Sequence, residues 1–219
     1  MYNKMSLNNK EMSYMEYIIE IGAILLASSL AMILHELPKS VVYVLTGRHC
    51  QAEDKYRIFK LHQYVDPVGW ILFLICHAGC SRPYPYRLKE KDTNVAIGLT
   101  GFLSLGVMLM AGYAFYHLVL PYLPMTLGLD ARGEVMIFLV QTSWYFIYAV
   151  FVLLIVNLFP MISSDIFLLI IAISPSKLIP LMKNDTMIKG LLIICIVLGG
   201  ISSLAVQGMS SLEQVLGFV

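Results

Sequence analysis

Long apolar runs alternate with short polar segments along this chain. Three runs, at about 17–45, 94–118 and 135–158, are long enough to cross a bilayer as helices, which takes about 20 residues each. A further run covers about 187–206. The run at 66–80 is at the short end for a span, so it is a short span, a re-entrant segment or a helix in the membrane plane. The pattern predicts an all-α polytopic membrane protein.

The basic residues of the connections give a topology. Residues 48–65 and 82–93 hold most of the lysines and arginines, whereas 119–134 holds only Arg132. If 66–80 does not cross, both basic connections lie on one side, which the positive-inside rule makes cytoplasmic. If 66–80 does cross, the bias is much weaker. We favour the first arrangement.

Composition supports the membrane assignment and excludes one class of partner. The chain is 58% hydrophobic and 13% charged, against about 25% charged in a typical soluble domain. A net charge of +1 argues against a strongly basic nucleic-acid binder, so no nucleic-acid partner is expected. The expected partners are the lipid bilayer and segments of membrane proteins.

The polar ends of the chain divide it into three parts. We expect a polar tail at 1–16, one membrane-embedded domain at 17–207 and a mildly amphipathic tail at 208–219. The first tail lacks an apolar core followed by small residues, so it is not expected to be a cleavable signal peptide.

The first apolar run contains three ionisable residues within five positions, His35, Glu36 and Lys39. Each charge near the centre of a spanning helix costs about 2.5–3.5 kcal/mol, so Glu36 and Lys39 facing lipid unpaired would cost about 5–7 kcal/mol. They must therefore pair with each other, with a metal or with groups of another span. Asp165, a lone acid beside a helix break, is the natural partner.

Other features of the sequence refine this expectation. Ser163 or Ser164 is placed to cap a short helix that starts near Asp165. Cys76 and Cys80 share a helix face, and we interpret them as buried thiols rather than as a soft-metal site because the chain has no CxxC pair.

The spacing of the ionisable residues is close to that of a metal site. His35 and position 39 share a helix face. In H-E-x-x-H, two histidines at this spacing bind zinc and the glutamate is the general base. Here Lys39 stands at the second histidine position, so the motif is incomplete.

Five segments in order make the chain resemble the site-2 protease family, the intramembrane zinc metalloproteases, in its compact bacterial form. They are ILHELPKSVVYVLTG, HQYVDPVGWILF, SRPYPY, GLTGFLSL and NLFPMISSDIF, and the resemblance covers about 20–205. It implies a helical bundle of about 4–6 membrane segments, with a small extended or β element around 82–86. It also implies a bacterial cytoplasmic membrane protein.

The resemblance assigns roles to individual residues. His35 and Asp165 would be zinc ligands, Glu36 the catalytic general base, and Asn157 a support for the loop that holds Asp165. A substrate segment would add as a strand beside Arg82 and Tyr84, which become candidate substrate-contacting residues. Several residues depart from the family pattern, namely Lys39, Pro38, Tyr64, Phe102, Leu105, Ile166 and Phe167.

These departures leave three functions open. The first is a degenerate homologue that binds membrane-protein segments, with the Lys39 ammonium near the metal position and no cofactor. The alternative is an active zinc protease in which Lys39, His62 or His77 supplies the missing ligand. A third, prompted only by the buried charges, is a transporter of ions or small molecules.

Overall fold

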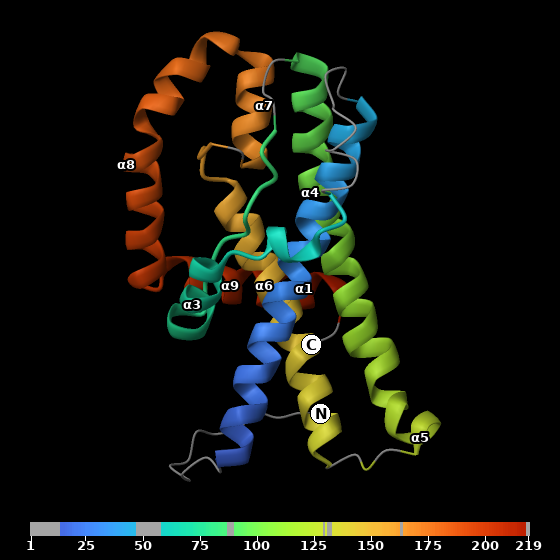
Figure 1. The fold of residues 1–219 in the computed structure, drawn as a ribbon. Helices are drawn as coiled ribbons and strands as arrows, with labels where there is room; N and C mark the ends of the chain where they lie inside the picture. The colour runs from blue at the N-terminus through green and yellow to red at the C-terminus, as the bar shows by residue number, and fades with distance from the viewer. Residues whose placement is uncertain are drawn as a thin grey trace.

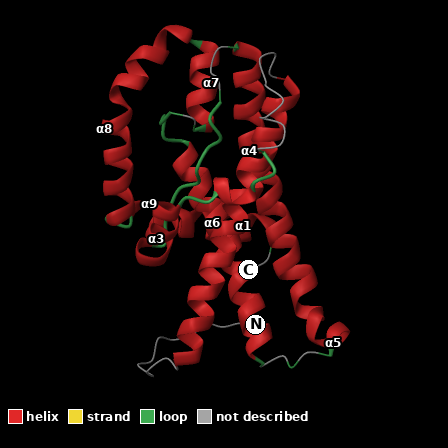
Figure 2. Cartoon of the chain, in the orientation of Figure 1, coloured by secondary structure: helices red, strands yellow, loops and turns green. Residues whose placement is uncertain are grey.

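The structure is a computed structural model, and it describes residues 14–46, 58–86, 90–128, 130, 133–162 and 164–217. The described residues form helices and loops, with no β-strand among them (Figure 2). The predicted all-α class is therefore confirmed for this part of the chain.

Three long helices form the centre of the molecule (Figure 1). They are α1 (Tyr14–Thr46), α4 (Lys91–Ala114) and α6 (Glu134–Asn157). Helix α1 packs against both others. Helix α4 continues through η2 (Phe115–Val119), η3 (Leu120–Tyr122) and α5 (Leu123–Leu127). Helices α1 and α6 and the continuous stretch Lys91–Thr126 are long and apolar enough to cross a membrane.

The uncertain run at 66–80 forms one short helix. After η1 (Leu61–Tyr64), α3 covers Pro67–Cys76. Ten residues extend about 15 Å as a helix, whereas the hydrocarbon core is about 30 Å thick. Helix α3 is thus too short to cross by itself. The topology that follows from this, with both basic connections on one side, stays a prediction.

The C-terminal part differs most from the expectation. Helix α7 (Asp165–Ile173) is followed by η4 (Pro175–Lys177), α8 (Leu178–Val197) and α9 (Gly200–Leu216). Helices α8 and α9 meet at an angle of 67°. Gly199 has a positive φ of 74°, a backbone conformation that glycine adopts at little cost and that ends α8.

The last span, expected at 187–206, is thus not one straight helix, because the chain bends inside it. The described part has three candidate membrane spans, or four if α8 and α9 together form one span. The expected number of membrane segments was about four to six, so the structure lies at or below its lower limit. The expected boundary at 208 lies inside α9. At the other end, residues 1–13 of the expected tail lie outside the described residues, and 14–16 belong to α1.

The connection between α3 and α4 was expected to be extended or β. Residues 81–86 are neither helical nor paired as a strand in the described structure, so the β element is not formed. The segment is nevertheless held in place. The Arg82 backbone N–H donates to the Tyr64 carbonyl at 3.1 Å, and the Tyr86 N–H donates to the Tyr84 carbonyl at 2.8 Å.

Two apolar clusters surround the position where α1, α4 and α7 meet. The larger lies mainly between α1, α4, α6 and α9. The smaller combines buried tyrosines with aliphatic and aromatic residues of α4 and α7, namely Tyr43, Ile58, Tyr64, Tyr84, Tyr86, Ile97, Phe167, Leu168 and Ile171. His35, Glu36, Lys39 and Asp165 are each no more than 1% exposed, so the ionisable residues are buried.

Candidate functional site

The Lys39 ammonium lies at the centre of the ionisable cluster. Its Nζ atom is 2.7 Å from Asp165 Oδ1 and 3.1 Å from Glu36 Oε1. It is also 3.4 Å from His35 Nε2. The expected meeting of Asp165 with the three residues of the first helix is thus present in the structure. The side chains of Lys39 and Asp165 are 0% exposed.

The number of contacts matches the chemistry of an ammonium group. A lysine ammonium has three N–H donors and no acceptor. Here three acceptors surround it, one each from His35, Glu36 and Asp165. All three donors therefore have a partner inside the protein, which offsets part of the cost of burying the charge.

Helix geometry explains how two elements build this arrangement. His35, Glu36 and Lys39 lie three and four positions apart on α1, so their side chains meet on one face. Asp165 is the first residue of α7. Ser164 is the N-cap of that helix, and its Oγ accepts from the Phe167 N–H at 3.3 Å. The prediction of a serine cap is confirmed at Ser164, while Ser163 lies outside the described residues.

The hydrogen bonds of His35 indicate one tautomer. Nε2 is 3.2 Å from Asn157 Nδ2 and 3.4 Å from Lys39 Nζ, both of which are donors. Nδ1 is 3.2 Å from Ser104 Oγ, whose own hydroxyl donates to the Gly101 carbonyl at 2.7 Å. A ring that accepts at Nε2 and donates at Nδ1 fits these contacts, with Asn157 and Lys39 sharing the single lone pair of Nε2. The Nε2 lone pair thus faces two donors, one of which is the ammonium.

Asn157 joins α6 to both sides of the cluster. Its Nδ2 contacts His35 and donates to the Leu153 carbonyl at 2.9 Å. Its Oδ1 accepts from the Asp165 backbone N–H at 3.4 Å. Asn157, the last residue of α6, therefore contacts the first residue of α7. This is the position at which the resemblance placed a support for the loop that holds Asp165.

Gly101 allows α7 to approach α4 closely. A Cβ atom at this position would lie 2.3 Å from the Asp165 carboxylate. No other residue type fits without moving the acid, because non-bonded heavy atoms do not approach this closely. The specific role of Gly101 is therefore to leave room for the Asp165 carboxylate.

Ser81 completes the cluster from the connection between α3 and α4. Its hydroxyl donates to Glu36 Oε1 at 2.7 Å. Glu36 Oε2 is buried and has no hydrogen-bond partner within the described residues. Sequence reasoning missed Ser81, since one serine in a polar loop has no distinguishing pattern.

The charges of the cluster do not cancel if both carboxyl groups are ionised. One ammonium faces two carboxylates, at Glu36 and Asp165, which leaves a formal charge of −1 in a buried site. An unbalanced buried charge is costly. His35 Nε2 also lies 3.4 Å from Asp165 Oδ2 and 3.6 Å from Glu36 Oε1, so the acidic oxygens share the site with the imidazole as well as with the ammonium.

A pocket of about 370 Å³ reaches the cluster from one side. Glu36 and Asn157 form part of its inner wall, and Ser81, Arg82 and Pro83 form part of its side. Arg82 thus lies beside an opening to the cluster. Tyr84 instead lies in the tyrosine cluster, with its ring centroid 5.9 Å from that of Tyr43.

Two side chains of the pocket region have altered acidities. Burial raises the pKa of the Cys80 thiol to about 12, and the nearby Asp66 carboxylate adds to the shift. Burial also raises the pKa of the Tyr86 hydroxyl well above its ordinary value, with a further contribution from the negative charge of Glu36. Both groups are therefore neutral at physiological pH.

The arrangement does not fit a zinc ion. A catalytic zinc takes three protein ligands and keeps one open position. The described part of the chain has no group of three or more His, Cys, Asp or Glu side chains arranged to hold a metal. The lone pair of His35 and an oxygen of Asp165 are directed at an ammonium, which cannot share its position with a cation.

The two candidate replacement ligands do not join the cluster. His62 is exposed on η1, and His77 is exposed at the end of α3, where it lines a different pocket together with Glu20. Of the candidate site residues, the structure brings together His35, Glu36, Lys39, Asn157 and Asp165. It places Arg82 at the adjoining pocket.

No family model matches this sequence, and no match is found among the curated proteins or the solved structures.

Proposed function

We propose that the chain is a multi-pass membrane protein of the site-2 protease type in which an ammonium group replaces the zinc ion. It binds membrane-spanning or membrane-proximal segments of other proteins without cleaving them. The proposed location, from the resemblance of the sequence, is the bacterial cytoplasmic membrane.

The contacts of Lys39 support this proposal above all. Its ammonium contacts three residues, His35, Glu36 and Asp165. In a zinc protease of this type, the histidine and the aspartate would bind the metal, and the glutamate would activate the metal-bound water. The ammonium supplies positive charge at the centre but cannot bind or deprotonate a water as a metal ion does. The packing around the cluster is thereby preserved, but the protein lacks the metal-activated water that would attack a peptide bond.

The adjoining pocket supports a binding function. It connects the outside of the bundle with Glu36 along residues 81–83. An extended peptide segment uses main-chain hydrogen bonds when it docks beside another extended segment. We propose that a partner segment lies along 81–86, with Arg82 contacting its polar groups.

Zinc stoichiometry tests the central claim. The purified full chain is incubated with zinc, desalted and analysed for metal. We expect no tightly held zinc in the wild type and about one equivalent in Lys39→His, which would complete the set of ligands a zinc site needs. Lys60→His is the matched control, because it adds a histidine at an exposed lysine outside the cluster. One equivalent of zinc in the wild type would contradict the proposal.

A cleavage and crosslinking experiment distinguishes binding from proteolysis. The full chain and a model single-span protein are placed together in lipid nanodiscs. We expect crosslinking without cleavage, and a lower crosslinking yield for Arg82→Gln than for Lys177→Gln, which removes an exposed charge outside the pocket. Cleavage by the wild type that is abolished in Glu36→Gln would instead support the alternative, an active zinc protease.

A further inference from the structure

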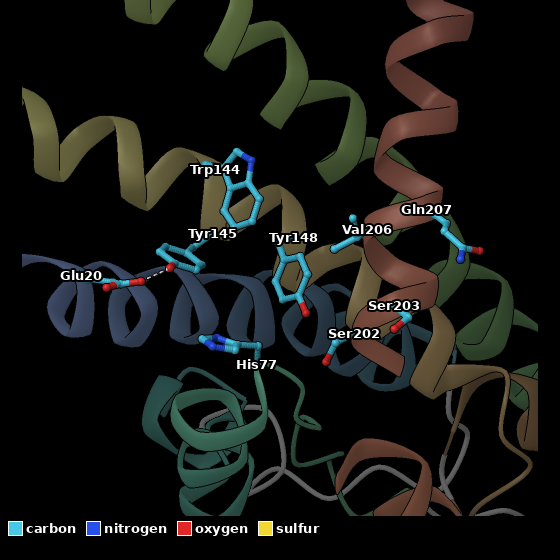
Figure 3. A pocket seen from close by; sticks show the side chains of 9 residues that line it. All are labelled: Glu20, His77, Trp144, Tyr145, Tyr148, Ser202, Ser203, Val206 and Gln207. Atoms are coloured by element: carbon cyan, nitrogen blue, oxygen red, sulfur yellow. Dashed lines mark hydrogen bonds between the residues drawn. The ribbon is translucent and has the colours of Figure 1, made fainter. Parts of the chain in front are cut away.

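A second pocket is lined by none of the ionisable residues of the Lys39 cluster, and Figure 3 shows the side chains around it. Its volume is about 600 Å³. Helices α1, α6 and α9 line it, together with His77, the residue that follows α3. It shares no lining residue with the pocket at Glu36.

The titratable side chains that line this pocket are one carboxylate, one imidazole and two tyrosine hydroxyls. Glu20 is its single acid, and its described lining includes no lysine or arginine. Glu20 stands where the apolar part of α1 begins, so its carboxylate is less hydrated than one in bulk water. The Tyr145 hydroxyl donates to Glu20 Oε1 (Figure 3). A carboxylate accepts about four hydrogen bonds, so one tyrosine donor leaves capacity for a cationic ligand.

Three aromatic residues of α6 form one wall. The rings of Trp144 and Tyr148 stack with centroids 5.5 Å apart and planes 6° apart. Tyr145 lies edge-on to Trp144, with centroids 5.1 Å apart. Trp144 is 37% exposed, whereas Tyr148 is only 5% exposed, so the wall runs from the surface inward. Faces of tryptophan and tyrosine rings attract organic cations, and quaternary ammonium groups in particular.

The opposite side is fixed by α3 and α9. His77 follows the last residue of α3 with φ 52° and ψ 24°, a left-handed conformation that a non-glycine residue adopts at a cost. Glycine would end the helix there with less strain. Ser202 donates to the Cys76 carbonyl at 2.9 Å and thereby ties α9 to the end of α3.

We infer that this pocket binds an alkylammonium group, with the cation held between the Glu20 carboxylate and the aromatic wall of Trp144, Tyr145 and Tyr148. The ammonium belongs either to a small soluble amine or to a lipid headgroup, since both present the same chemistry. If the rings were only interfacial anchors, they would face lipid. The burial of Tyr148 and the bond from Tyr145 to Glu20 show that these two tyrosines face the protein interior instead, while Trp144 stands at the pocket's exposed end.

A fluorescence titration tests the inference. The chain has two tryptophans, so Trp70→Phe leaves Trp144 as the single reporter. In maltoside micelles, choline should change the Trp144 emission with saturation, while its uncharged analogue 3,3-dimethyl-1-butanol should not. Because both ligands have the same shape, an equal response to both would overturn the inference. This comparison needs no change at Glu20, so it does not depend on the folding of a variant.

A pair of variants locates the site. Glu20→Gln in the same background should weaken choline binding at least tenfold, because the amide keeps the shape but not the charge. Glu16→Gln is the matched control, one turn earlier on α1 and outside the pocket. It should leave binding unchanged. Equal affinity in Glu20→Gln and Glu16→Gln would also overturn the inference.

Native mass spectrometry separates the two sources of the ammonium. Phosphatidylcholine or phosphatidylglycerol is added to the micelles, and retained lipid is counted. Retention of phosphatidylcholine that depends on Glu20, without similar retention of phosphatidylglycerol, assigns the site to a headgroup. Saturable binding of choline without lipid retention assigns it to a soluble amine. If neither binds, the pocket has no such ligand and the inference is wrong.

Discussion

Lys39 Nζ lies 2.7 Å from Asp165 Oδ1, and this contact joins the long first helix to the first residue of α7. Neither side chain is exposed to solvent. Helix α7 is short and follows an irregular loop, so few contacts determine its position in the apolar bundle. The ion pair specifies that position, because any other placement of α7 leaves the buried Asp165 carboxylate without its cationic partner.

Removing the ammonium should destabilise the protein more than removing the Asp165 charge. Lys39→Met leaves two carboxyl groups facing each other in a buried site, and the loss of one partner of a buried pair costs about 3–5 kcal/mol. Asp165→Asn leaves the Lys39–Glu36 pair, whose formal charges cancel. We therefore expect Asp165→Asn to lower the free energy of unfolding by less than Lys39→Met does. Unfolding in mixed micelles, followed by circular dichroism, measures both.

The double variant provides the control for this comparison. Lys39→Met with Asp165→Asn removes a cation and an anion together, so its loss should be smaller than the sum of the two single losses. Strictly additive losses would contradict the pairing seen in the structure.

Gly101→Ala should disturb the cluster although it adds only one methyl group. The new Cβ would lie 2.3 Å from the Asp165 carboxylate, so α4 and α7 must separate. Overpacking of this kind costs about 1–3 kcal/mol. The measurement is again the free energy of unfolding in mixed micelles.

Gly106→Ala is the matched control on the same helix. Gly106 is exposed, and a Cβ there meets nothing within 4 Å. Alanine should therefore stabilise α4 by about 0.5–1 kcal/mol through its better helix propensity. Equal effects of the two substitutions would show that the close approach at Gly101 is not as described.

Much of the candidate site could be predicted because charges in apolar segments are rare and need partners. His35, Glu36 and Lys39 stand out in the first apolar run, and Asp165 stands out as an acid beside a helix break. The serine cap and the length of α3 also follow from local rules, since capping and helix rise depend on only a few neighbouring residues.

The rest depends on contacts between distant segments, which periodicity does not encode. Nothing in the loop sequence marks Ser81 as a donor to Glu36. The bend between α8 and α9 was missed because the apolar run continues through Gly199 and Gly200, and glycines in such a run do not by themselves require a turn. The pocket at Glu20 needs α1, α6, α9 and the end of α3 in place before its residues meet.

Ser81→Ala should measure the contribution of the loop to the cluster. The serine hydroxyl donates to Glu36 Oε1 at 2.7 Å, and a hydrogen bond to a charged group contributes about 1.5–3 kcal/mol. We expect a loss of free energy of unfolding in that range. Ser176→Ala, at an exposed position of η4, should change it by less than about 0.5 kcal/mol. Equal effects of the two would contradict a bond between Ser81 and Glu36.

Cys80 should react slowly with maleimide despite its partial exposure. The thiolate is the reactive form, and an ordinary cysteine has a pKa of about 8.5. Burial, with a contribution from Asp66, raises the pKa of Cys80 to about 12. A raised pKa favours the neutral thiol, so at pH 8 the thiolate fraction falls from about 0.2 to about 10⁻⁴ and labelling should be about 10³-fold slower.

Single-cysteine variants make this labelling experiment decisive. With Cys50, Cys76 and Cys195 replaced by serine, the labelling rate of Cys80 should rise about tenfold per pH unit from pH 7 to pH 10, because its pKa lies above that range. A control chain that has Val68→Cys, at an exposed position of α3, and no other cysteine should level off near pH 9 instead. Asp66→Asn removes the negative charge and should speed the labelling of Cys80, while asparagine still caps α3. If Cys80 levelled off at the same pH as the thiol of the Val68→Cys control, it would not be buried against Asp66, and the packing of the 77–86 connection would need revision.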